Sequence, residues 1–326
     1  MKLTSLARRA LPFFLSLAVA AGTTAAHAQD KVIRLAWTPS ADVPHIPVAL
    51  AEELWKSKGL EVSIVTFPSG RESLEALLGG QVDVAAIAEF PAATAALRGQ
   101  KIGVVADVAR YKANRIVTTA ATPTLASLAS RKLGATVGTN AQFQLETAMA
   151  AAGITGTIVN AAPADLLPTL VRKDIDAAAM FPAFFARAKQ TLGDQYREIP
   201  TPSYVTHFLL VASEGVMKDK PAVLTSFITG FVAAEASIAK NPQAAQQAVV
   251  KATNGAVPAA AVAAGWADYD FRVVLQEDLI TQINAEAAWI LGKGLVKSSQ
   301  PPAEAIRAII RPEFLKQAAS ERVTLK

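Results

Sequence analysis

The side chains that could do chemistry in this chain lie where predicted strands end and helices begin. They offer hydroxyl and amide groups, an imidazole, a carboxylate and aromatic rings. The candidate ligand-binding residues are Trp37, Thr38, Ser40, His45, Ser69, Gly70, Glu89, Phe90, Thr139, Asn140, Gln142 and Phe181. Ligands of open α/β sheets bind outside the carboxyl ends of the strands, so we expect these residues to face one cleft.

Three predicted helix starts favour an anionic ligand. They lie at Gly70, at Asn140-Ala141 and at Pro91. The first turn of a helix has free N–H groups and the positive end of the helix dipole, which together attract an anion. The sequence therefore favours a sulfonate or a carboxylate on the ligand.

Glu89 opposes a simple inorganic anion, because a carboxylate on the cleft wall repels negative charge. A zwitterion such as taurine would satisfy both kinds of group. A heterocycle with an amino group, stacked by Trp37 or Phe90, would also satisfy Glu89. In a third interpretation Glu89 points into solvent and does not contact the ligand.

Several candidates also have a purely structural interpretation. Ser69 and Thr139 are suited to accept hydrogen bonds from free helix N–H groups as N-caps. Phe181 has the character of a core residue. His45 lies between two prolines, where a structural imidazole is as reasonable as a ligand contact.

The motifs of common enzymes are missing from this sequence. It has no Gly-x-Ser-x-Gly elbow, no metal-ligand cluster and no phosphate-binding Gly-Lys-Ser/Thr. It has no cysteine, which excludes a disulfide framework, a thiol nucleophile and a cysteine-type zinc site. We therefore predict a binding protein that uses no cofactor and no metal, and not an enzyme.

The elements that would position the candidate residues alternate between strand and helix. Strands are predicted at residues 32–37, 60–67, 82–88 and 101–108, with helices between them. This order predicts a parallel sheet with right-handed crossovers.

A second series of strands and helices follows in residues 115–202, and the apolar segment 206–212 is predicted to return to the first lobe. The rest is mostly helical and should pack on that lobe. Its predicted helices span residues 221–239, 242–252, 258–266 and 277–291.

Residues 74–96 are similar in sequence to residues 167–188, and this internal repeat suggests two similar lobes. Leu77 matches Leu170, and Asp83 matches Asp176. Both aspartates precede strands, and we interpret them as turn residues and not as a carboxylate pair.

Residues 1–28 have the pattern of a cleaved export signal. Lys2, Arg8 and Arg9 precede an apolar segment that is too short for a membrane span, and Ala26-His27-Ala28 forms the cleavage motif. We predict a soluble periplasmic protein. The remaining chain is close to neutral and has no dense basic run, which argues against nucleic-acid binding.

Three segments then resemble a known family. They are Gly59-Leu60-Glu61-Val62, Phe67-Pro68-Ser69-Gly70 and residues 76–84, and residues 176–182 resemble the second-lobe signature. The pattern is similar to that of the periplasmic solute-binding proteins of nitrate, aliphatic-sulfonate, taurine and thiamine-pyrimidine importers.

The resemblance implies a two-lobed α/β periplasmic binding protein fold with two hinge crossovers, near residues 108–111 and 204–208. Residues 29–110 and 207–326 would form lobe 1, and residues 111–206 would form lobe 2. It implies a monomer that binds a small molecule by domain closure and delivers it to the permease and ATPase of an ABC importer.

Two other functions are compatible with the resemblance. One is a sensory protein that presents its ligand to a membrane receptor. The other is an enzyme, because the family includes an iron-dependent thiamine-pyrimidine synthase that consumes its own histidine. That enzyme has cysteines in its motif, and this chain has none.

Overall fold

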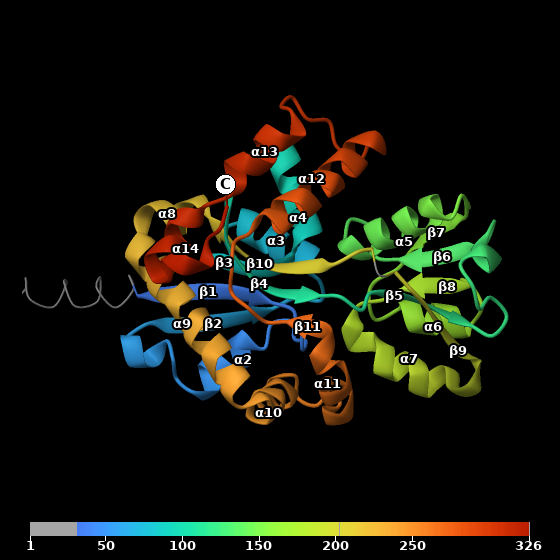
Figure 1. The fold of residues 1–326 in the computed structure, drawn as a ribbon, viewed down its shortest axis with the longest axis horizontal. Coiled ribbons are helices and arrows are strands. Elements are labelled where there is room, and N and C mark those ends of the chain that lie inside the picture. The colour runs from blue at the N-terminus through green and yellow to red at the C-terminus, as the bar shows by residue number, and fades with distance from the viewer. Residues whose placement is uncertain (1–30, 202, 326) are drawn as a thin grey trace, which may run out of the picture.

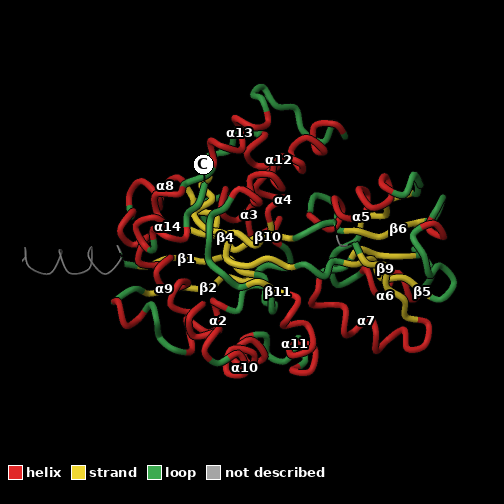
Figure 2. The backbone as a smooth tube through the Cα atoms, viewed as in Figure 1, coloured by secondary structure: helices red, strands yellow, loops and turns green. Residues whose placement is uncertain are grey.

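The computed structural model describes residues 31–201 and 203–325, and Figure 1 shows them as two lobes side by side. The predicted export signal lies outside the described residues. Each lobe is built on its own sheet, and the chain passes between the two groups of strands in Figure 2. The predicted two-lobed α/β fold is confirmed.

Lobe 1 contains a mixed sheet in the order β11-β4-β10-β3-β1-β2. Its main strands are β1 (Val32–Trp37), β2 (Glu61–Thr66), β3 (Val84–Ala88), β4 (Ile102–Tyr111) and β10 (Thr206–Ser213), with the short β11 (Tyr269–Asp270) at one edge. Strand β1 pairs in parallel with β2 and β3.

The expectation of a parallel sheet is wrong at β10. This strand does return to lobe 1, as predicted, but it lies antiparallel between β3 and β4. It is buried along most of its length, and a strand buried on both faces has a continuous apolar sequence. Such a sequence does not encode which neighbours the strand pairs with, or in which direction.

Lobe 2 repeats this topology in the order β7-β6-β8-β5-β9. Its strands are β5 (Arg115–Thr119), β6 (Lys132–Ala135), β7 (Thr157–Asn160), β8 (Ala177–Ala179) and β9 (Tyr196–Pro200). Here β6 pairs in parallel with β7 and β8, and the antiparallel β5 takes the place that β10 has in lobe 1.

The internal repeat of residues 74–96 and 167–188 corresponds to two matching helix–strand–helix units. In lobe 1 the unit is α3 (Gly70–Leu78), β3 and α4 (Glu89–Leu97), and in lobe 2 it is α6 (Leu166–Val171), β8 and α7 (Phe185–Leu192).

The matched aspartates make the same contact in both lobes. Asp83 accepts a hydrogen bond from the Arg34 backbone N–H at 2.8 Å, and Asp176 accepts one from the Lys132 backbone N–H at 3.0 Å. Each carboxylate thus ties the start of its own strand to the adjacent strand.

The remaining helices cover the two sheets. They are α2 (His45–Ala51), α5 (Asn140–Ala151), α8 (Glu214–Asp219), α9 (Pro221–Lys240), α10 (Pro242–Ala252), α11 (Ala259–Gly265), α12 (Glu277–Gly292), α13 (Pro302–Ile309) and α14 (Pro312–Ala318). As predicted, the C-terminal helices pack on lobe 1, with α9 against β1 and α2, and α12 against α4.

Helix α9 is long and apolar enough to cross a membrane, but its buried face packs in the core of lobe 1. Trp55 stacks on Phe227 at 5.3 Å and donates a hydrogen bond from Nε1 to the Phe227 carbonyl at 2.9 Å. The indole lies against the backbone of Gly230, where a Cβ atom would be 2.1 Å from Nε1. The apolar composition of α9 is therefore explained by packing.

Candidate ligand-binding cleft

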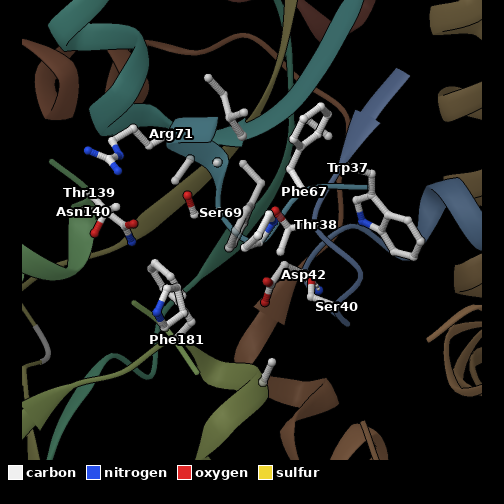
Figure 3. A pocket seen from close by; sticks show the side chains of 18 of the residues that line it. Trp37, Thr38, Ser40, Asp42, Phe67, Ser69, Arg71, Thr139, Asn140 and Phe181 are labelled. Carbon is white, nitrogen blue, oxygen red and sulfur yellow. Dashed lines mark hydrogen bonds between the residues drawn. The ribbon is translucent and has the colours of Figure 1, made fainter. Parts of the chain in front are cut away.

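A cavity of about 340 Å³ lies between the lobes and takes its walls from both of them. Figure 3 shows Thr139, Asn140 and Phe181 of lobe 2 on one side, and Trp37 and Thr38 of lobe 1 on the other. The predicted residues that line it are Trp37, Thr38, Ser40, Ser69, Gly70, Thr139, Asn140 and Phe181. The structure thus brings together residues from distant parts of the sequence.

The lobe 1 wall follows from the parallel strands β1, β2 and β3. Parallel neighbours end at the same edge of a sheet, so the loops after them converge. Thr38 and Ser40 follow β1, Ser69 follows β2, and Pro91 lies one turn beyond β3.

Three helices begin at the cavity, and two of them, α3 and α5, have a hydroxyl cap. Ser69 Oγ accepts from the Glu72 N–H at 3.4 Å at the start of α3, and Thr139 Oγ1 accepts from the Ala141 N–H at 3.3 Å at the start of α5. The structural interpretation of these two hydroxyls is thus correct, although both residues also line the cavity. Gly70 and Asn140 are the first residues of these helices and face it as well.

Two buried polar atoms of the β1 end have no hydrogen-bond partner among the described residues. They are Trp37 Nε1 and Thr38 Oγ1. A buried polar group without a partner costs on the order of 1–3 kcal/mol. Both residues line the cavity, so a ligand could supply the missing partners.

Two charged residues line the cavity among those described, Arg71 and Asp42. Arg71 is half-exposed on α3, and its side chain lies so close to Gly138 of lobe 2 that a Cβ there would be 3.3 Å from Arg71 Cδ. Asp42 follows β1 and accepts a hydrogen bond from the Tyr269 hydroxyl. Sequence reasoning missed Asp42, although it lies between the candidates Ser40 and His45.

Apolar side chains complete the walls. Phe67 and Phe208 come from lobe 1, and Phe184 comes from lobe 2. Phe208 lies on β10, whose place in the sheet the sequence did not define, and it therefore was not among the candidates. The cavity combines these rings with few polar groups, which is the usual character of a small-molecule site.

Glu89 does not lie on the cleft wall, so the prediction that it contacts the ligand is wrong. Its side chain is fully buried. One carboxylate oxygen accepts from the Tyr204 hydroxyl, and the other accepts from the His207 backbone N–H at 3.0 Å. Burial raises the pKa of Glu89, and burial together with the nearby Glu89 holds the pKa of Glu286 well above its usual range.

The third interpretation of Glu89, a side chain in solvent, is wrong as well. Helix α4 begins at Glu89, two residues before the predicted start at Pro91, and the Glu89 side chain points away from the cavity, toward β10 and α12. A helix start has side chains on all sides, and only the tertiary packing decides which of them face the cleft.

His45 also lies outside the cavity walls, because it is buried under α9. Its ring is fully buried and stacks on Phe231 at 5.8 Å. Nε2 lies 2.8 Å from the Phe271 carbonyl oxygen. Burial, the largest effect, and the charges of Arg110 and Arg322 lower the pKa of His45 to about 3. The imidazole is neutral and structural.

Phe90 and Gln142 support the cleft without lining it. Phe90 is buried and packs edge-on against Trp289 at 5.8 Å. Gln142 accepts a hydrogen bond from the Gly138 N–H at 2.9 Å and donates one to Glu146 at 2.8 Å. It thereby fixes the loop that precedes Thr139.

The described residues contain no group of three or more His, Cys, Asp or Glu side chains that could hold a metal ion. The groups at the cavity are donors, acceptors and rings. Their arrangement suits the recognition of a small organic molecule.

Comparisons with known proteins agree with this geometry. The family model described as NMT1/THI5 like matches residues 42–245. The alkanesulfonate-binding protein SsuA from Xanthomonas axonopodis pv. citri bound to MOPS has a TM-score of 0.75 at 18% identity, over 86% of this chain and 98% of that one.

Two further structures have the same fold. SsuA from Escherichia coli, a periplasmic aliphatic sulphonate binding protein, has a TM-score of 0.73 at 20% identity, over 86% of this chain and 92% of that one. The periplasmic nitrate-binding protein NrtA from Synechocystis PCC 6803 has a TM-score of 0.71 at 13% identity, over 89% of each chain. No curated protein matches the sequence significantly.

Proposed function

The chain belongs to the NMT1/THI5-like family, and we propose that it is a periplasmic solute receptor that delivers a small organic ligand to an ABC importer. The observation that carries the proposal is the cavity between the lobes, with two capped helix starts on its walls and the lining residue Trp37, whose buried N–H has no partner among the described residues. The role is binding and not catalysis, and the partners are the permease and ATPase.

The ligand carries a sulfonate or carboxylate in this proposal. Arg71 and the first turns of α3 and α5 bring positive charge to the cavity from both lobes. An anion that contacts both helix starts would hold the lobes together, since each N-terminus binds negative charge. An amino-bearing heterocycle is the alternative, because Phe181 and Phe208 offer rings for stacking.

Delivery uses domain closure. The chain crosses between the lobes twice, between Tyr111 and Arg115 and between Pro200 and Thr206. Asn114 ties the two crossings together, because its Nδ2 donates to the Tyr111 and Tyr204 carbonyls, both at 3.2 Å. Segments that join two lobes near one point are suited to act as a hinge.

Native mass spectrometry of the protein purified from a periplasm tests the proposal. We expect a bound organic molecule that is released on unfolding and that raises the melting temperature when it is added back. A Trp37→Phe variant, which lacks the indole N–H, should retain less of it. A protein that carries no molecule, and that no sulfonate, carboxylate or amino heterocycle stabilises, would contradict the proposal.

Small-angle scattering tests closure separately. The radius of gyration should fall when the saturating ligand is added. A radius that stays unchanged in the saturated protein would exclude closure while leaving the binding function intact.

A further inference from the structure

Asp42 places a negative charge in the cavity at a distance from the positive groups. Figure 3 shows Arg71 and Asp42 on different sides of the cavity, with Ser69 and Thr38 between them. Arg71 lies near the helix starts, and Asp42 lies in the loop that follows β1. The cavity is therefore positive at one end and negative at the other.

Neutral groups hold the Asp42 carboxylate in place. The Tyr269 hydroxyl donates to Oδ1, and the Asp42 backbone N–H donates to Ser40 Oγ at 3.3 Å, which fixes the backbone that carries the carboxylate. Tyr269 is itself fixed by stacking on Phe271 at 5.2 Å and by contact with Tyr111 at 4.7 Å. Movement of the carboxylate would break its hydrogen bond to the Tyr269 hydroxyl.

Asp42 forms no ion pair with any Lys, Arg or His of residues 31–201 and 203–325. Burial raises the pKa of Asp42, because the charged form loses solvation without gaining a cation. Asp42 is only partly buried and lines the cavity. Charges that lose solvation in proteins are normally paired. In the cavity the missing cation can come from the ligand.

We propose that Asp42 selects ligands with an amino group, which it binds while the other end of the ligand contacts Arg71 and the starts of α3 and α5. The inference rests on the proposed function. It assigns a ligand that is anionic at one end, carries an ammonium or amino group at the other, and has an apolar middle that lies against Phe181 and Phe208. Asp42 thus has the role that the sequence predicted for Glu89, which is to bind the amino group of the ligand.

Calorimetry with matched pairs of probes tests this selection. The first pair is taurine and 1-propanesulfonate, and the second is 4-(aminomethyl)benzoate and 4-ethylbenzoate. Within each pair a methyl group replaces the ammonium group at similar size. We expect at least one amino probe to bind about tenfold or more tightly than its methyl partner, because hydrogen bonds to charged groups are strong.

Asp42→Asn should remove most of this preference, because the amide keeps an oxygen for the Tyr269 hydroxyl but has no charge. Tyr269→Phe is the matched control. It removes the hydroxyl and leaves the charge, so the preference for the amino probe should persist. A purely structural role of Asp42 predicts instead that both variants behave alike.

Three results would overturn the inference. They are equal or tighter binding of the methyl probes, a preference that Asp42→Asn leaves unchanged, and a wild-type protein that binds no probe of either pair. None of these bears on the solute-receptor function, which the molecule that copurifies with the protein tests independently.

Discussion

Protonation of His45 should destabilise the protein in acid. The ring is fully buried, Nε2 is engaged with the Phe271 carbonyl, and Nδ1 has no partner among the described residues. A second proton would place a charge on Nδ1 without solvent or a hydrogen-bond acceptor. Burial, with the charges of Arg110 and Arg322, accordingly lowers the pKa of His45 to about 3.

The size of the effect follows from proton linkage. An unfolded histidine takes up its proton near pH 6.5, so between about 3 and 6.5 the unfolded state binds more protons than the folded state. The free energy of unfolding therefore rises with pH across this window, and the contribution of His45 to stability is lost as the pH falls. At about 1.4 kcal/mol per pH unit, His45 accounts for a loss of about 3 kcal/mol between pH 7 and pH 4.5.

Urea unfolding of the wild type and of His45→Gln at both pH values measures this loss. Gln can donate to the Phe271 carbonyl, and any cost of the substitution at pH 7 cancels in the comparison between pH values. The wild type should lose about 3 kcal/mol more than the variant on acidification. An equal loss in the two proteins would refute the reasoning.

His207 provides a control of opposite sign. Burial lowers its pKa, but the hydrogen bond and charge of Asp107 outweigh burial and raise it overall. The stability that His207 contributes is fully present below pH 6.5 and is lost as the pH rises through its folded pKa. The His207→Gln variant should therefore lose at least as much unfolding free energy as the wild type when the pH falls from 7 to 4.5.

Four further substitutions test the packing of the protein by urea unfolding. Phe143→Ala should cost about 3–5 kcal/mol, because this lobe 2 ring is buried in the core of lobe 1, and a loss below about 1 kcal/mol would contradict that contact. Gly230→Ala should cost about 1–3 kcal/mol or more through its clash with Trp55, whereas a neutral result would mean that the indole moves freely. Glu89→Ala should cost about 3 kcal/mol, because it leaves the Tyr204 hydroxyl unpaired. Glu89→Gln should cost less, and it should leave the ligand affinity measured by calorimetry little changed.

The sequence by itself determined the order of the elements and much of the cleft wall. Glycine and proline punctuation located four helices of the C-terminal region, of which α9, α10 and α12 match their predicted ranges closely, while α8, α13 and α14 were not predicted. Trp37, Ser69 and Thr139 were found because strand ends and helix starts have local signals. Such signals depend on residues close in the chain, so no tertiary information is needed to identify them.

The pairing of β10 was decided only by the tertiary structure. Its apolar run identifies a buried strand, but neither the direction nor the neighbours of such a strand are written in local sequence. The insertion of β10 between β3 and β4 also places Phe208 at the cavity. A residue of this kind cannot be assigned to a site before the sheet order is known.

The direction of each side chain was the other feature that sequence could not supply. Glu89 and Asp42 both follow strands of lobe 1, yet the packing of β10 and α12 buries Glu89 while Asp42 faces the cavity. His45 similarly follows the end of β1 but is covered by α9. Local sequence brings a residue to the edge of the sheet, and contacts with distant segments determine whether its side chain enters the cleft.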